Sequence, residues 1–217
     1  MKVLILGATG RTGKIVLQRA LEEGYEVNCL ARNSIRIRKQ NRLTVFEGNP
    51  TNTADLENAF SDCNAVISVL NVSRKSDFPW SKLRTPENYL SETMKVLIPI
   101  AEKRNVKRIV VCSAWGAAET KKDTPGWFRW FIDHSNIGAA YRDHERQEKL
   151  LSDSNLDWTI VRPVGLINST KNQKVKESFD NNPKPNLIIS RKTVGEYLIA
   201  CMRNKALIKH SVVISAE

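Results

Sequence analysis

A glycine-rich segment near the start of the chain has the residue types and the spacing of a dinucleotide-binding loop. Gly7, Gly10 and Gly13 follow the apolar run 2–6 and lead into a helical pattern. In such a loop the first glycine permits a tight turn, the second lets the backbone approach a pyrophosphate, and the third lets the helix pack against the sheet. Free amides at the start of the helix then bind the anion. The sequence therefore predicts a nicotinamide dinucleotide here, the alternative being a glycine-rich turn without a ligand.

The end of the second apolar run indicates which nicotinamide cofactor is bound. An acidic residue at this place hydrogen-bonds a free ribose 2′-hydroxyl and repels a 2′-phosphate. The run ends in Leu30, Ala31 and Arg32, without Asp or Glu. Because a guanidinium is well suited to binding phosphate, the sequence predicts NADP rather than NAD, with Arg32 on the 2′-phosphate.

The elements that must position this loop alternate regularly between strands and helices. Short apolar runs typical of buried parallel strands occupy residues 2–6, 26–31, 43–46, 65–70, 108–112, 158–161 and 212–215. Helical patterns occupy residues 12–23, 53–60, 86–104, 141–153 and 193–202, and Thr85 can cap the third of them. This order predicts an α/β fold with right-handed crossovers: a Rossmann-like, doubly wound, mostly parallel sheet with helices on both faces. The 217 residues are expected to form a single NAD(P)-binding domain, residues 1–217.

Two long segments, 71–85 and 113–140, show no regular pattern and follow the fourth and fifth predicted strands. Ligands of open α/β sheets bind at the carboxyl ends of the strands, so both segments are expected to line a binding crevice. They carry six large aromatic residues that could hold a flat ring: Trp80, Trp115, Trp127, Phe128, Trp130 and Phe131. The alternative is a hydrophobic helix face over residues 126–132 that packs on the body or on a partner subunit.

The composition is that of a globular protein with an excess of positive charge. Hydrophobic residues make up 41% of the chain, and 34 Lys and Arg against 23 Asp and Glu give a net charge of +11. Such a charge favours a phosphorylated cofactor, nucleic acid or a membrane surface as partner. The basic residues are spread along the chain without a recognised nucleic-acid motif, so we expect no specific nucleic-acid partner.

Neither the cysteines nor the apolar runs indicate an extracellular or a membrane protein. The four Cys form no C-x-x-C pair, so we expect no metal site and no disulfide framework. No run approaches the roughly 18 apolar residues that a membrane span needs. The expectation is a cytoplasmic protein with reduced thiols and no membrane partner, present as a monomer or homodimer.

Four segments of the chain together resemble the atypical short-chain dehydrogenase/reductase group. They are the glycine loop 7–13, the run ending in Arg32, the triplet 47–49 and the segment 157–163. More narrowly, nearly the whole chain is similar to NAD(P)H-binding proteins related to biliverdin IXβ reductase and flavin reductase, and to the NmrA-like redox sensors. Relatives often carry Gly-Asp where this chain has Gly48 and Asn49, whose side-chain amide can still contact adenine. The cofactor-binding residues then implied are Gly7, Thr9, Gly10, Arg11, Thr12, Gly13, Arg32, Asn49, Leu70, Ser113, Pro163 and Val164.

The same resemblance implies two catalytic candidates. Ser113 follows the fifth strand, where the family has its active-site serine, and His144 lies where some reductases keep a histidine near the substrate. We expect His144 to protonate near neutral pH, the alternative being a surface histidine at the start of a helix.

One departure from the related alcohol dehydrogenases limits the chemistry. They use Tyr-x-x-x-Lys, in which the ammonium lowers the tyrosine pKa, whereas this chain has Tyr141 followed by Glu145. A carboxylate there disfavours tyrosinate. We therefore expect an NADPH-dependent oxidoreductase that transfers hydride to a small, flat, conjugated acceptor: a flavin bound as substrate, a quinone or a bilin-like molecule. The alternative is a non-catalytic, NmrA-like NADP sensor that acts through a protein partner.

Overall fold

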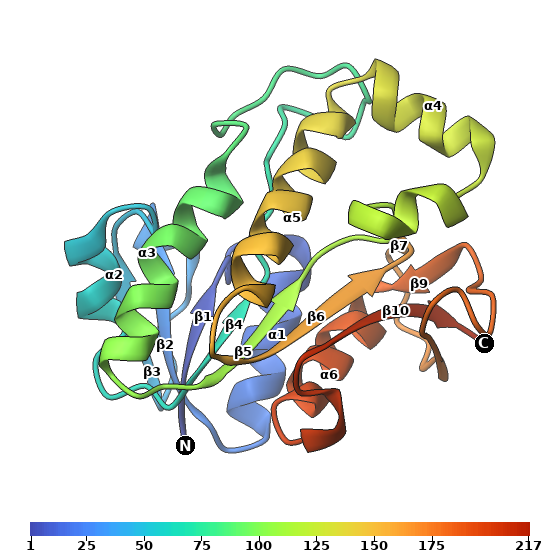
Figure 1. Ribbon diagram of the computed structural model, residues 1–217. Coiled ribbons are helices and arrows are strands. Elements are labelled where there is room, and N and C mark those ends of the chain that lie inside the picture. Colours follow the sequence, from blue (N-terminus) through green and yellow to red (C-terminus); the bar gives the residue numbers. More distant parts are fainter.

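A mostly parallel sheet forms the centre of the computed structural model, which describes residues 1–217 (Figure 1). Its strand order is β3-β2-β1-β4-β5-β6-β10-β8, and only β8 is antiparallel to its neighbour. The strands are β1 (Lys2–Leu6), β2 (Glu26–Ala31), β3 (Leu43–Glu47), β4 (Ala65–Ser68), β5 (Arg108–Cys112), β6 (Asp157–Pro163), β8 (Val175–Ser178) and β10 (His210–Ala216). The order reverses between β1 and β4, which is where doubly wound folds bind their ligands. This confirms the predicted Rossmann-like fold.

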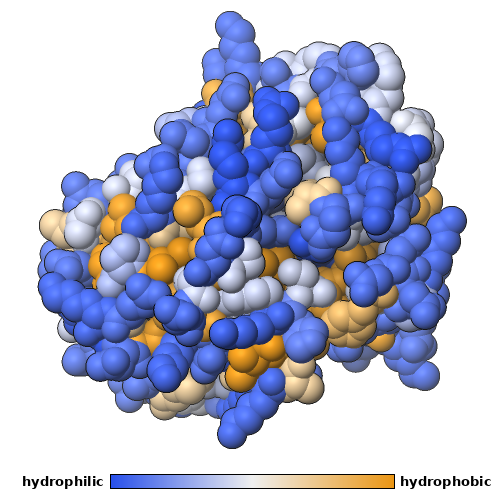
Figure 2. Space-filling model, in the orientation of Figure 1, coloured by the Kyte–Doolittle hydropathy of each residue, from blue (hydrophilic) through white to orange (hydrophobic).

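The sheet is buried on both faces because successive side chains of each strand point to opposite sides. In β1, Val3 and Ile5 belong to the hydrophobic core beside α1 (Arg11–Glu22) and α6 (Arg191–Cys201). Leu4 and Leu6 belong to the core on the other face, beside α2 (Thr53–Ala59), α3 (Tyr89–Lys103) and α5 (Ile137–Ser152). The continuous apolar run of β1 is therefore explained by two cores, one on each face of the sheet. On the face of the molecule shown in Figure 2, hydrophilic side chains predominate, with apolar side chains visible between them.

The segments after β4 and β5 lie beyond the carboxyl ends of the strands. The first forms a hairpin-like loop over residues 74–83, and the second contains a 3-10 helix, η2 (Ala118–Asp123), and α4 (Gly126–His134). The expectation of an irregular segment 113–140 was therefore wrong, because α4 and the start of α5 lie within it. The alternative given for residues 126–132, a hydrophobic helix, agrees with α4.

Other differences from the predicted elements have local causes. A short two-stranded sheet, β7 (Gly165–Ile167) with β9 (Ile188–Ser190), was not predicted. Two further 3-10 helices are present: η1 (Ser34–Arg36) follows β2, and η3 (Lys205–Leu207) precedes β10. Helix α3 begins at Tyr89, so Thr85 does not cap it. The Thr85 hydroxyl instead accepts a hydrogen bond from the Ser73 amide at 2.9 Å. No helix combines the length and the apolar composition needed to cross a bilayer.

The close approach of α1 to β1 can be tested with two alanine substitutions. A Cβ at Gly13 would lie 2.0 Å from the Gly7 carbonyl oxygen, whereas at Gly126 the nearest atom would be 3.9 Å away. We expect Gly13→Ala to lower the free energy of unfolding by about 1–3 kcal/mol, the usual cost of overpacking. Gly126→Ala is the control and should be neutral or slightly stabilising. Equal midpoints of the two variants in denaturant unfolding would contradict the close approach.

Candidate functional site

The glycine loop places three free amides at the start of α1. Gly7 has a φ of +88°, and a Cβ there would lie 2.8 Å from the Val69 carbonyl oxygen, so only glycine fits without strain. The amides of Arg11, Thr12 and Gly13 donate to no protein acceptor. Free amides at a helix N-terminus bind anions, helped by the helix dipole. The loop is therefore ready to hold a phosphate group.

A cleft of two adjoining chambers begins at this loop. The loop chamber has a volume of about 320 Å³ and is lined by the start of α1 and by residues after β4 and β5. The aromatic chamber has a volume of about 470 Å³ and extends to Trp115, Trp127 and Phe128. Both chambers include Ser113 and His144 in their walls. An extended molecule bound at the loop can thus reach the aromatic chamber.

Most of the predicted cofactor residues lie together along this cleft. Gly10, Arg11, Thr12, Gly13, Leu70 and Ser113 line the loop chamber, and Arg11, Ser113, Pro163 and Val164 line the aromatic chamber. Gly7 and Thr9 belong to the turn between β1 and α1 and line neither chamber. Their contribution is to the shape of the loop.

Arg32 and Asn49 lie outside both chambers, after β2 and β3. Arg32 is exposed, and its guanidinium carbon is 5.6 Å from the centre of the Tyr89 ring, so the ring limits where the side chain can lie. The Asn49 side-chain oxygen accepts a hydrogen bond from the backbone amide of Thr51 at 3.3 Å. The backbone amide of Asn49 donates to the Asp55 carboxylate at 2.8 Å. Asn49 thus shapes its own turn, and its side-chain nitrogen remains free to contact a ligand.

Ser113 is the most unusual polar group in the cleft. Its side chain is buried, with 5% of the residue exposed, and its Oγ has no hydrogen-bond partner. Its amide donates to the Val161 carbonyl at 2.7 Å, which fixes the residue against β6. Because an unpaired buried hydroxyl costs free energy, the arrangement favours a ligand that supplies the missing partner.

His144 lies in the middle of α5 and faces both chambers. Only 3% of the residue is exposed, and burial lowers its pKa to about 4. The expectations that it opens a helix and that it protonates near neutral pH were therefore wrong. Helix α5 begins earlier, at Ile137, so His144 lies inside the helix and its ring is buried. The residue is a neutral imidazole at physiological pH.

Tyr141, one turn before His144, lacks the lysine that lowers the tyrosine pKa in the related dehydrogenases. Burial raises its pKa, and the charge of Arg74 offsets this only in part. The residue four positions later, Glu145, is exposed and acidic. Its ring packs edge-on against Phe128, with 5.9 Å between centroids. Tyr141 therefore contributes an apolar wall to the aromatic chamber.

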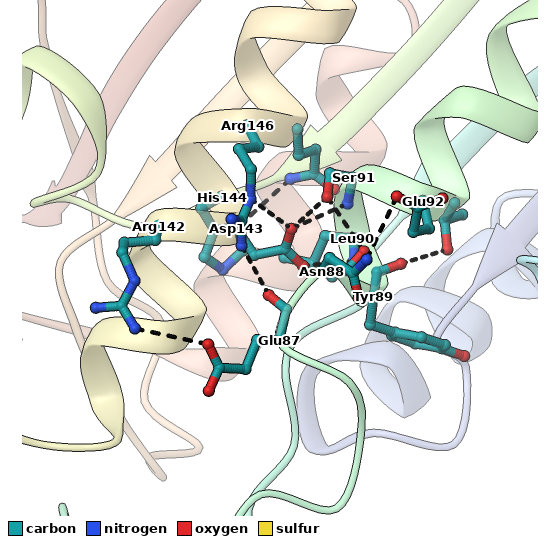
Figure 3. A network of polar contacts seen from close by, with 12 residues as sticks. Glu87, Asn88, Tyr89, Leu90, Ser91, Glu92, Arg142, Asp143, His144 and Arg146 are labelled. Atoms are coloured by element: carbon teal, nitrogen blue, oxygen red, sulfur yellow. Dashed lines mark hydrogen bonds and ion pairs between the residues drawn. The ribbon is translucent and has the colours of Figure 1, made fainter.

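Asp143 fixes the position of α5, a role that the sequence did not reveal. Its carboxylate is fully buried and accepts bonds from the Leu90 amide at 2.6 Å, the Ser91 amide at 3.2 Å and the Ser91 hydroxyl at 2.6 Å (Figure 3). Arg146 lies 3.5 Å from the same carboxylate. Asp143 thus caps the start of α3 from a neighbouring helix, since Asn88 makes no side-chain cap of its own. This contact holds α5, with Tyr141 and His144, over the cleft.

Arg162 makes a second buried polar contact behind the cleft. Its guanidinium bonds Glu148 of α5 at 2.6 and 3.1 Å, and Glu119 of η2 at 2.5 and 3.2 Å. Arg162 and Glu148 are almost fully buried, whereas Glu119 is largely exposed. The contact joins β6, α5 and η2 and places the next two residues, Pro163 and Val164, in the chamber wall.

Positive charge gathers where the two chambers meet. Arg11 pairs with Asp77 through two bonds of 2.9 and 2.8 Å, and Arg74 and Arg191 line both chambers. The Arg11 hydrogen bonds lower the pKa of Asp77, and the charges of Arg191 and Arg74 add to this. A cleft with this lining favours a negatively charged ligand.

The cleft contains one thiol, that of Cys112 at the end of β5. Burial raises its pKa to about 12, so it is protonated at neutral pH. No group of three or more His, Cys, Asp or Glu side chains is arranged to hold a metal ion.

Comparison with solved structures finds the same fold. A short-chain dehydrogenase/reductase from Veillonella parvula, solved in complex with NADP, has a TM-score of 0.80 at 19% identity, with 99% of this chain and 94% of that chain covered. ChuY, an anaerobilin reductase from Escherichia coli O157:H7, has a TM-score of 0.81 at 19% identity, with 100% and 97% covered. At this identity the likeness concerns the fold alone.

Comparison of sequences identifies the family. The photosystem II assembly factor Ycf39 of Trieres chinensis is 34% identical over 203 residues, which is 91% of this chain and 56% of the relative. Ycf39 of Synechocystis is 28% identical over 183 residues, 83% of this chain and 50% of the relative. The chain thus spans about half the length of these curated relatives. The sequence pattern of NAD(P)H-binding proteins matches residues 7–205. This protein is therefore a member of the NAD(P)H-binding family and has its Rossmann-like fold.

Proposed function

We propose that the protein is an NADPH-dependent reductase that transfers hydride to a flat, conjugated acceptor such as a flavin, a quinone or a bilin-like molecule. The observation that carries the proposal is the cleft itself. It joins an anion-binding loop to an aromatic chamber at a buried, unpartnered hydroxyl, Ser113, and contains no acid that titrates near neutral pH.

The residues present fit a bound NADPH. The free amides of residues 11–13 would hold its pyrophosphate, and Arg32 its 2′-phosphate. The Ser113 hydroxyl, at the junction of the chambers, would orient the nicotinamide amide or an acceptor oxygen, and Pro163 and Val164 would form the adjoining wall. NADPH supplies a hydride when bound, and the protein contributes position and electrostatics.

The walls of the aromatic chamber determine which acceptors suit it. Trp115, Trp127 and Phe128 offer ring faces and edges to a flat molecule. His144 stays neutral and Tyr141 stays protonated, so neither side chain supplies a proton readily. A conjugated acceptor needs little help, because its ring system spreads the incoming charge and takes its proton from solvent. The name of the similar fold ChuY, an anaerobilin reductase, agrees with such an acceptor.

A second candidate function is supported by specific observations. Several aromatic side chains near the cleft are exposed, and two relatives are named as assembly factors. An NADP-binding protein that reports redox state to a partner would share these features. Turnover of NADPH separates the two functions, because a sensor binds the cofactor without consuming it.

The proposed reductase activity is tested by NADPH oxidation with a panel of FMN, FAD, a water-soluble quinone and biliverdin. We expect steady loss of NADPH with at least one acceptor and none without an acceptor. Ser113→Ala should lower the rate only a few-fold, because a neutral hydrogen bond that orients a ligand contributes about 1 kcal/mol. The control is Ser178→Ala, which removes another buried, unpartnered hydroxyl that lies outside the cleft.

One result would count against this activity, and another would change the role of Ser113. Binding of NADPH without turnover of any acceptor would favour the sensor. A loss of 10² to 10⁴ in rate, typical of a missing general acid, would mean that Ser113 does more than orient a ligand.

The preference for NADPH is tested at Arg32. Because one charge-assisted contact to the 2′-phosphate is removed, Arg32→Ala should weaken NADPH binding roughly ten- to a hundredfold and leave NADH binding almost unchanged. Arg104→Ala, which removes an exposed arginine at the end of α3, is the control for net charge. Calorimetry that finds equal affinities of the unaltered protein for NADPH and NADH would refute the assignment.

The buried, neutral His144 predicts a pH dependence of stability. Its pKa is about 4 in the folded protein and 6.5 in the reference state, so the unfolded chain binds the proton more readily. Stability is thus complete above about pH 6.5 and is lost as the pH falls toward 4. Between pH 7 and pH 4.5 the unaltered protein should lose about 2–3 kcal/mol more unfolding free energy than His144→Gln. Denaturant unfolding at both pH values provides the measurement, and equal losses would show that the ring is hydrated.

A further inference from the structure

The cleft is bordered by an exposed group of aromatic side chains, here called the aromatic rim: Phe78, Trp80, Trp127, Trp130 and Phe131. Four of them are exposed: Phe78 by 62%, Trp80 by 43%, Trp127 by 62% and Trp130 by 51%. Their rings form a continuous group with neighbouring centroids 5.4 to 6.4 Å apart. Monomeric proteins rarely expose so much contiguous apolar surface unless it binds something.

The rim is a fixed feature built from two separate segments. The loop 74–83 follows β4 and α4 follows η2, and Figure 1 shows α4 at the margin of the molecule, away from the sheet. The Trp80 indole donates to the His134 carbonyl at 2.9 Å, and Asn136 donates to the Trp80 carbonyl at 2.9 Å. These contacts lock the loop to α4, so the exposed rings are held in place together.

The loop that carries Phe78 and Trp80 also carries two lysines. Lys75 and Lys82 are neighbours in the loop, since the Lys75 amide donates to the Lys82 carbonyl at 2.9 Å. The next residue, Leu83, packs inward against a small hydrophobic cluster. Alternate residues of an extended segment point to opposite sides, so Lys82 points outward where Leu83 points inward. Lys75, which lies opposite Lys82, points the same way, and both lysines are exposed.

The cations near the rim are largely uncompensated. Lys75 and Lys82 form no ion pair, whereas Asp77 of the same loop and Asp133 of α4 are each already paired, with Arg11 and Lys121. The segments that carry the rim therefore combine exposed indole rings with unpaired ammonium groups. That combination matches the interface of an anionic bilayer, where indoles lie at the level of the headgroups and cations bind phosphate.

We propose that the aromatic rim docks the protein on the surface of an anionic lipid bilayer. The rings enter the headgroup region, and Lys75 and Lys82 contact the phosphates, so the attachment is peripheral. The net charge of +11 adds long-range attraction. This differs from the expectation of no membrane partner, and it does not depend on the acceptor proposed above. Because Trp127 belongs to both the rim and the aromatic chamber, the cleft opens beside the lipid.

The test is sedimentation with vesicles of phosphatidylcholine, alone or mixed with phosphatidylglycerol. We expect binding to the mixed vesicles, weakened by salt, and little binding to phosphatidylcholine alone. The pair Lys75→Gln and Lys82→Gln should reduce the partition coefficient roughly 30-fold, from about 1 kcal/mol per cation. The pair Phe78→Ser and Trp130→Ser, neither of which lines the cleft, should reduce it on the order of tenfold or more.

A matched control separates the rim from net charge. Lys107→Gln with Lys205→Gln removes the same charge from residues that precede β5 and β10, at the amino ends of the strands and away from the rim. This pair should leave vesicle binding unchanged. Thermal unfolding midpoints verify that every variant is folded.

Three results would overturn the docking proposal. The first is absence of the unaltered protein from the vesicle pellet, and the second is equal binding to neutral and anionic vesicles. The third is an equal loss of vesicle binding in the Lys75/Lys82 variant and in the Lys107/Lys205 control. Light scattering adds one more outcome. A dimer that Phe78→Ser with Trp130→Ser converts to a monomer, without vesicle binding, would assign the rim to a second copy of the chain.

Discussion

The backbone contact between Gly13 and Gly7 is the constraint on which the rest of the site depends. A single added carbon at Gly13 would lie 2.0 Å from the Gly7 carbonyl oxygen, so α1 can start here only because Gly13 lacks a side chain. The contact points the first amides of the helix into the cleft. It also brings β1, α1 and the residues after β4 to one place. The anion site thus results from how closely a helix can approach a strand.

Two buried carboxylates then determine where the opposite wall stands. Asp143 ties α5 to the start of α3, and Glu148 ties α5 to Arg162 at the end of β6. Both are strong, directional contacts in a region that water does not reach. Helix α5 is consequently held at two points, with Tyr141 and His144 on the cleft side. Asp143 and Glu148 do not line the cleft themselves, but they fix the position of the residues that do.

The sequence was a good guide where a residue's role is local, and a poor guide where it depends on distant neighbours. Apolar runs predicted the parallel strands of the main sheet, because burial on both faces leaves a continuous hydrophobic pattern. The glycine spacing predicted the loop, because φ and close approach are properties of the residue itself. The start of α3 was misplaced because its cap, Asp143, comes from more than 50 residues away. The protonation of His144 likewise depends on burial by other elements, which periodicity does not reveal.

The protonated thiol of Cys112 has a chemical consequence for the acceptors that the cleft can hold. Quinones are electrophiles, and a thiolate adds to their ring carbons to form a covalent thioether. Only the thiolate is nucleophilic enough to do so readily, and burial of Cys112 keeps its pKa near 12. A protonated thiol that lines the cleft reacts with a quinone far more slowly than a thiolate does, so the raised pKa of Cys112 is compatible with the proposed acceptors.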